Sequence, residues 1–274
     1  MIPASPRPAQ SRTVTALRGR LPRAAYLRDL LRELVGRELK LRYKRSALGI
    51  AWSLLVPLAQ LLVFVFLSRA VLRLDIPNYP LFVFTGLLAW NWFQSSLLVG
   101  AGAVTDNRTL IRRPGFPAAV LPAVTVLTGL IHYLLALPVL LAFALVSGAP
   151  LTPALLALPG LILLQFGLTL GLTSLLASLH VTFRDLQHLL GVLLTLLFYL
   201  TPVFYSPDNV PAQYRTLLHL NPLASLLDAQ RTVLIEGQWP PLAPLLWLAA
   251  VSVGLLALGH LVFTRTSERF VEEL

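Results

Sequence analysis

The sequence predicts an all-α integral membrane protein, and two observations carry this prediction. Hydrophobic residues make up 56% of the 274 residues and charged residues only 12%, about half the charged share of an ordinary globular domain. The charges are also segregated, because 12 of the 22 Lys and Arg lie before Gly49 and long uncharged apolar stretches follow. Such stretches are long enough to cross a hydrocarbon core of about 30 Å as helices.

Six apolar segments are the candidates for transmembrane helices, and together they make residues 49–274 one transmembrane domain. No Asp, Glu, Lys or Arg lies inside them. This absence argues against an ion-coupled transporter or proton pump, because such proteins place ionisable groups at mid-membrane. The six segments cover about 49–67, 79–104, 116–146, 153–179, 186–205 and 241–264.

The N-terminal region is expected to have two parts. Residues 1–25 are rich in Pro and Arg and contain no apolar core, which predicts a disordered basic arm without a cleavable signal peptide. Residues 26–48 are expected to form a cytoplasmic amphipathic helix at the membrane interface, because leucines recur at helical spacing opposite a cationic face. These leucines are Leu27, Leu30, Leu31 and Leu34.

The distribution of basic residues predicts that both termini are cytoplasmic. With the N-terminus inside, the cytoplasmic segments hold 18 Lys and Arg, whereas the external loops hold four. Lys and Arg near helix ends favour the cytoplasmic side. The net charge of +10 is therefore attributed to topology and to contact with anionic membrane lipids, not to nucleic-acid binding. The four external residues are Arg69, Arg73, Arg215 and Arg231.

The external segment 206–239 contains two short amphipathic stretches separated by Asn221-Pro222. A helix should break there, because proline disfavours α geometry in the residue before it. Each stretch is too short to span the membrane. Two short re-entrant helices and a cap lying on the outer surface are both compatible with this pattern.

No catalytic, cofactor-binding or metal-binding site is predicted in this chain. There are no cysteines, and no HExxH motif is present. The only lysines, Lys40 and Lys44, are not preceded by glycine, so neither belongs to a P-loop. If ATP drives this protein, a separate chain must bind the ATP and Mg²⁺ and hydrolyse the ATP.

Aromatic and polar residues within the spans are candidates for the lining of a channel. Sugar rings pack their C–H faces on aromatic rings, and their hydroxyls need hydrogen-bond partners. The alternative is interfacial anchoring, because Trp and Tyr are enriched at membrane surfaces. The candidate lining residues are Gln60, Phe64, Phe198, Tyr199 and Tyr205.

Two groups of residues near the first and third spans carry a resemblance to a known family. The first is the basic run 37–49, RELKLRYKRSALG, followed by Trp52 and Pro57. The second opens the third span and consists of Phe116-Pro117 and Leu121-Pro122.

A third group lies around the end of the fifth span. It comprises LTPVFY at 200–205, followed by Val210-Pro211, Tyr214-Arg215 and Leu220-Asn221-Pro222. Together the three groups resemble the permeases of type 2 ABC exporters that move polysaccharide, O-antigen, capsule or teichoic acid. The resemblance covers nearly the whole chain from Tyr26 onward.

The resemblance implies a homodimeric permease of the bacterial cytoplasmic (inner) membrane, with two ATP-binding cassette subunits docked below it. The cargo would be a lipid-linked glycan, and the external stretches would be re-entrant gate helices. The chain departs from the family pattern at Ala118 and Ala119, where members often carry a basic and an acidic residue. The residues expected to couple to the ATPase are Arg37, Glu38, Arg42, Asp106, Arg108 and Arg112.

Two other functions remain compatible with the sequence. A type 2 exporter of drugs or small lipophiles would share the fold and lack the glycan-facing aromatics. An intramembrane glycosyl or acyl transferase would need convergent carboxylates or histidines near one interface. Only Asp185, with His180 and His188, offers such a group.

Overall fold

The computed structural model describes residues 23–46, 48–72, 75–268 and 270–273, so most of the predicted basic arm lies outside the described residues. All regular secondary structure in these ranges is helical. Within them, five helices are long and apolar enough to cross a membrane. They are Gly49–Val71, containing α3 (Trp52–Leu67), α4 (Tyr79–Ala101), α6 (Val120–Val146), Pro153–Thr182, containing α7 (Leu158–Thr182), and α11 (Leu242–Ser267).

The predicted fifth span is shorter than expected. The apolar helix α8 covers Leu186–Leu200, which is 15 residues, whereas the hydropathy pattern suggested 186–205. Thr201 leaves the helix with extended geometry (φ −99°, ψ 133°) because it precedes Pro202. The segment after it is therefore irregular, and α8 is shorter than the five helices that are long enough to cross a membrane.

Other boundaries differ by a few residues. The first apolar helix continues through Ser68–Leu72 and so includes Arg69, which the sequence pattern had assigned to an external loop. The third begins at Val120 and not at residue 116, because a turn precedes it.

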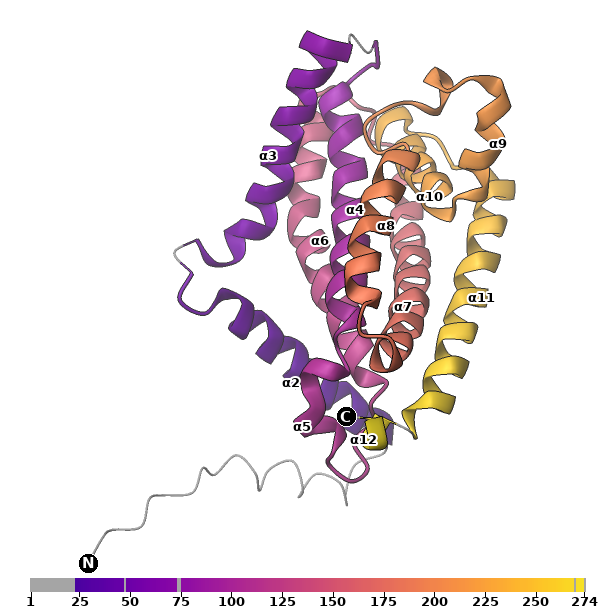
Figure 1. Cartoon of the computed structure of the whole chain (residues 1–274). Helices are drawn as coiled ribbons and strands as arrows, with labels where there is room; N and C mark the ends of the chain where they lie inside the picture. Colours follow the sequence, from indigo (N-terminus) through magenta and orange to yellow (C-terminus); the bar gives the residue numbers. More distant parts are fainter. Residues whose placement is uncertain (1–22, 47, 73–74, 269, 274) are drawn as a thin grey trace, which may run out of the picture.

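The helices form a bundle with two distinct ends (Figure 1). The basic helix α2 (Arg23–Tyr43), the short helix α5 (Arg108–Ile111) and α12 (Phe270–Glu273) lie at one end, together with the C-terminus. The helices α9 (Ala212–Leu220) and α10 (Pro222–Arg231) lie at the other end. Asp106, Arg108 and Arg112 are thus separated from the segment 206–239 by the length of the bundle, whereas the second half of α2 rises along α6 to the level of His132, which bonds to Tyr43.

Helix α4 is the centre of the bundle. It contacts α3, α6, α7, α8 and α10, and most of its residues are buried, from Leu81 through Trp90 without interruption. Because protein surrounds it, α4 can carry polar residues such as Thr85 and Ser96, and it is the least apolar of the five long helices.

Helices α7 and α11 pack closely through small residues. A Cβ atom at Gly259 would collide with the backbone of Gly171, and one at Gly171 would collide with the backbone of Leu255 and Leu256. Close backbone approach at glycine is a common way for membrane helices to associate, because the hydrophobic effect does not drive them together in lipid.

Helix α2 packs its apolar stripe against protein. The predicted leucines Leu27, Leu30, Leu31 and Leu34 lie with Val35 beside Val120, Val124, Leu127 and Ile131 of α6. The sequence pattern favoured contact with the membrane interface, but an apolar stripe is equally satisfied by a neighbouring helix. The helix ends at Tyr43, shortly before Arg45 adopts a left-handed conformation (φ 63°).

The external segment breaks where the sequence predicted, at Asn221. The Asn221 side chain caps α10 by accepting a hydrogen bond from the Leu223 amide (3.0 Å), and its Nδ2 donates to Thr201 Oγ1 (2.9 Å). The two short helices differ in burial, because α9 is largely exposed whereas seven of the ten residues of α10 are buried.

Candidate functional site

The predicted channel-lining aromatics form one cluster where α3, α4 and α8 meet. Phe64 of α3 stacks on Phe204 with ring centroids 5.1 Å apart and lies 5.9 Å from Phe198 of α8. Trp90 of α4 meets Phe198 edge to face at 5.4 Å. Tyr199 packs on Phe198 at 5.5 Å. Such aromatic pairs contribute about 0.5–1.5 kcal/mol beyond their area burial.

Polar groups lie beside this aromatic cluster on α3 and α4. Gln60 Oε1 accepts a hydrogen bond from Asn91 Nδ2 (2.9 Å), which joins the two helices. The Trp90 indole donates to Gln94 Oε1 (2.9 Å). Gln60 lies one helical turn from Phe64, so the structure brings the polar and aromatic candidates into one region.

Tyr205 completes the cluster. Its ring meets Phe204 edge to face at 5.2 Å, and its hydroxyl donates to the Tyr199 carbonyl (3.1 Å). The four predicted lining aromatics therefore belong to one cluster, and Gln60 lies one helical turn from it on α3. The cluster reaches the surface of the chain, because the Tyr199 side chain is 60% exposed.

Neighbouring aromatics on the same helices do not join the cluster. Phe66 is 65% exposed. Trp92 of α4 packs instead against Tyr133 of α6 and donates to the Val126 carbonyl (3.1 Å). The aromatic run 90–93 is therefore divided between two faces of α4, as its helical geometry requires.

Sequence reasoning missed Arg231, which it had counted as an external loop charge. The side chain is only 4% exposed. Its guanidinium donates to the carbonyls of Pro202 (2.7 Å), Val203 (2.8 Å) and Phe82 (3.4 Å), and it lies 3.5 Å above the Phe82 ring. Arg231 thus joins α10 to α4 and to the segment that carries Phe204.

Gly86 makes room for this arginine. A Cβ atom there would lie 2.9 Å from both Arg231 Nη2 and the Val203 carbonyl oxygen. The sequence signal for this contact was one arginine after the apolar face of the second amphipathic stretch, and it did not indicate which groups the arginine would bind.

The predicted coupling residues divide into two groups. Asp106 lies in a 3₁₀ turn (Thr105–Asn107), and Arg108 in α5 donates to the Thr105 carbonyl (3.1 Å). Arg112 follows α5, and the side chains of all three are exposed. Arg37, Glu38 and Arg42 lie on the second half of α2, and Arg42 is close to the corner between α2 and α3.

The described residues contain no group of three or more His, Asp or Glu side chains that could hold a metal ion. His180 is buried, whereas Asp185 and His188 are exposed. No side-chain hydrogen bond or ion pair joins these three residues within the described part of the chain, and only the His188 amide bonds to the Asp185 carbonyl (3.1 Å) as α8 begins.

The long apolar helices and the apolar surfaces they expose define a polytopic membrane protein. The chain matches the ABC-2 type transporter family over residues 29–235, most of its length, and it belongs to that family.

Curated relatives share nearly the full length of the chain. It is 42% identical to the O-antigen export system permease protein RfbA of Myxococcus xanthus, over 93% of this chain and 99% of the relative. It is 33% identical to a protein of the same name from Klebsiella pneumoniae, over 91% and 96% respectively. It is 28% identical to the polysialic acid transport protein KpsM of Escherichia coli, over 85% and 91%.

Replacing Arg231 should loosen the outer end of the bundle. We expect Arg231→Gln to lower the free energy of unfolding by about 2–3 kcal/mol, because it removes charge-assisted hydrogen bonds to buried carbonyls. Arg231→Lys should lower it by a smaller amount, since a single ammonium cannot donate to all three carbonyls with the geometry of the planar guanidinium. Thermal unfolding of the purified chain measures both effects.

Arg215→Gln is the matched control, because this exposed arginine of the same external segment also donates to backbone carbonyls. It should change stability by less than about 1 kcal/mol. The chain has no cysteine, so Val203→Cys introduces a single buried thiol. Maleimide should label that thiol faster in the Arg231→Gln background, and equal labelling in both backgrounds would contradict the assigned role.

Proposed function

We propose that this chain is the membrane-spanning subunit of an ATP-driven exporter that moves a lipid-linked polysaccharide across the bacterial cytoplasmic membrane. The observation that carries the proposal is the 42% identity to an O-antigen export permease over nearly the whole of both chains. The aromatic and amide groups between α3, α4 and α8 support it. Aromatic rings can pack on the C–H faces of a sugar, and amides can hydrogen-bond to its hydroxyls.

The proposed assembly contains two copies of this chain and two ATP-binding subunits, which bind ATP and Mg²⁺. The apolar faces of α3 and α8 support a second copy at this position. Leu62 of α3 is 72% exposed and Val192 of α8 is 59% exposed. Two copies meeting along these helices would bring two aromatic clusters together around one path, with Gln60, Phe64, Phe198, Tyr199 and Tyr205 lining it.

The proposed topology has six passes with both termini in the cytoplasm. Helix α8 contacts α4 and α7, and Figure 1 places its far end near α9 and α10. The irregular residues 201–206 would complete the fifth pass, which is acceptable only where protein shelters the backbone. In this arrangement α10 is a re-entrant helix, because it packs against α4, α7 and α11 within the bundle.

The proposed domain division follows from this topology. Residues 1–25 are a basic arm, 26–48 an interface helix and 49–274 the transmembrane domain. The ATP-binding subunits would dock at the end that carries α2 and α5. Arg37, Glu38, Arg42, Asp106, Arg108 and Arg112 would transmit their motion.

Export of the glycan tests the function. Deleting the gene should remove the polysaccharide from the cell surface, and restoring the chain should return it. Phe64→Ala should lower the export rate about threefold or more, because it removes two aromatic contacts of the cluster. Trp247→Ala is the control, since this exposed aromatic lies on α11, outside the cluster and away from the exposed faces of α3 and α8. Unchanged surface glycan after deletion would disprove the cargo assignment.

Co-purification tests the partner. An affinity-tagged chain should retain an ATP-binding subunit, and Arg108→Glu should lower its recovery by about fivefold or more, because reversing an interfacial charge opposes docking. Arg215→Glu, which reverses an exposed arginine at the opposite end of the bundle, should leave recovery unchanged. Equal recovery with both variants would exclude the α5 end as the docking surface.

Single cysteines test the topology, since the chain has none of its own. A membrane-impermeant maleimide should label Asp208→Cys in intact spheroplasts and Glu268→Cys only after permeabilisation. Both positions are exposed, one near α9 and the other after α11. Labelling of Glu268→Cys in intact spheroplasts would contradict the cytoplasmic assignment of the C-terminus.

A further inference from the structure

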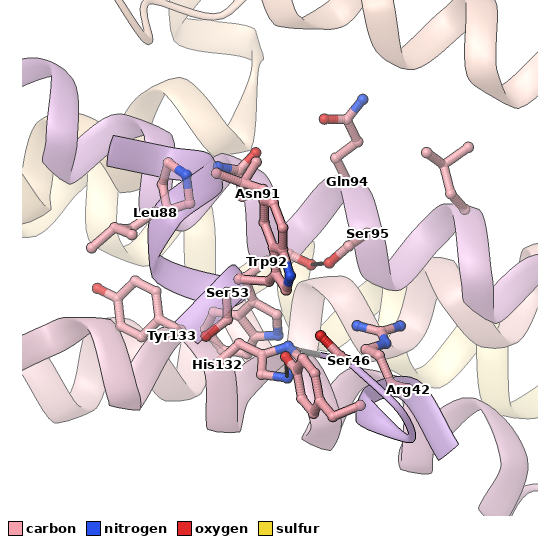
Figure 2. Close-up of a pocket in the computed structure, with 16 residues that line it drawn as sticks. Arg42, Ser46, Ser53, Leu88, Asn91, Trp92, Gln94, Ser95, His132 and Tyr133 are labelled. Carbon is pink, nitrogen blue, oxygen red and sulfur yellow. Dashed lines mark hydrogen bonds between the residues drawn. The ribbon is translucent and has the colours of Figure 1, made fainter. Parts of the chain in front are cut away.

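A cavity of about 510 Å³ lies on the inner side of the corner between α2 and α3, and helices α4 and α6 form its other walls (Figure 2). Phe64, Phe198 and Tyr199 of the aromatic cluster do not line it, whereas Asn91 and Gln94, which bond to Gln60 and Trp90 beside that cluster, do. Its volume falls in the range of sites that hold one small ligand.

The interior of the cavity is mainly apolar. Trp52, Val56 and Pro57 of α3 face Leu88 and Leu98 of α4 across it. Trp52 is 50% exposed and Val56 is 48% exposed, so the cavity continues onto the apolar outer surface of α3. A hydrocarbon chain is the ligand that such a surface favours, because lipid tails and apolar side chains pack without loss of hydrogen bonds.

The rim of the cavity is cationic. Arg42 lines it, and within the described residues its guanidinium makes neither a salt bridge nor a hydrogen bond. Lys40, Lys44 and Arg45 lie nearby in the sequence and are exposed. A cation at the cytoplasmic end of a membrane helix attracts anionic headgroups.

A further polar group in the wall is without a partner. The Tyr133 side chain is 2% exposed, and its hydroxyl makes no hydrogen bond within the described residues. Buried hydroxyls are normally satisfied by protein or by a bound group. By contrast, a hydrogen bond joins Nε2 of the neighbouring His132 to the Tyr43 hydroxyl (2.9 Å) and links α6 to α2.

We propose that this cavity binds one anionic phospholipid of the bilayer. Its phosphate lies at Arg42, and an acyl chain extends between Trp52, Val56 and Leu98. The α4 wall also carries Asn91 and Gln94, whose amides already bond to Gln60 and Trp90. Arg42 and the apolar wall of α3 therefore favour an amphiphile with an anionic headgroup over an uncharged polysaccharide segment. The proposal does not depend on the identity of the exported cargo, and its test needs neither ATP nor glycan.

The test is native mass spectrometry of the purified full chain titrated with dioleoyl-phosphatidylglycerol or dioleoyl-phosphatidylcholine. The anionic lipid should show one high-affinity copy per chain, and Arg42→Gln should weaken that copy about tenfold, because it removes a charge-assisted contact. Arg32→Gln is the control, since Arg32 is exposed on the same helix and does not line the cavity.

A second pair of variants tests the apolar part independently. Val56→Trp should fill the cavity and remove the high-affinity copy. Val63→Trp adds the same bulk to an exposed position of α3 that does not line the cavity, and it should have no effect. Thermal unfolding of all variants checks that each is folded.

Three results would overturn the proposal. Equal binding of the two lipids would show that the charge of the headgroup is not recognised. Displacement of the lipid by glycerol 3-phosphate would indicate a site for a free phosphate. Tighter binding of a polyprenyl diphosphate at Arg42 would assign the cavity to the lipid carrier of the cargo instead of to the bilayer.

Discussion

The end of the bundle that carries α9 and α10 depends on the hydrogen bonds made by the backbone after α8 ends. Pro202 stops this helix and leaves the carbonyls that follow without helical partners. Arg231 donates to two of them, and the Tyr79 hydroxyl donates to the third, at Phe204 (2.9 Å). A buried backbone group without a partner costs about 1–3 kcal/mol, so these donors permit an irregular segment at this buried position.

This arrangement also places the aromatic cluster. Phe204 stacks on Phe64 because its own backbone is held by Tyr79, and Asn221 ties Thr201 to the start of α10. The segment 206–239 and the surface formed by α3 and α8 are therefore parts of one unit. A change in this segment would be transmitted to the cluster through backbone hydrogen bonds and not only through side-chain packing.

Hydropathy and charge predicted much of the fold. The predictions were confirmed where the length and composition of one segment, or the presence of one proline, determine its structure. Five of the six segments are long apolar helices, because length and composition determine whether a helix suits a bilayer. The break at Asn221 was predictable from proline geometry alone. The end of α8 followed the same rule at Pro202, but the apolar run continuing to Tyr205 concealed it.

Contacts between distant residues could not be predicted from the sequence. An apolar stripe on α2 fits lipid and protein equally well, and only the three-dimensional arrangement assigns it to α6. Likewise the sequence pattern assigns Arg231 to a loop. The carbonyls that its guanidinium binds belong to residues 82, 202 and 203, which are distant in the sequence. The aromatic candidates were selected because sugar rings pack on aromatic side chains. The structure brings them into one cluster, and their position along a channel is a proposal.

The central position of α4 bears on how the protein is made. Its polar residues are accommodated because other helices surround it, so the isolated segment has the weakest affinity for lipid among the long helices. During synthesis α4 emerges before α6 and α7, which later enclose it. Its stable integration must therefore await those helices, and mutations on α6 or α7 that weaken the contact are expected to reduce yield at the insertion step.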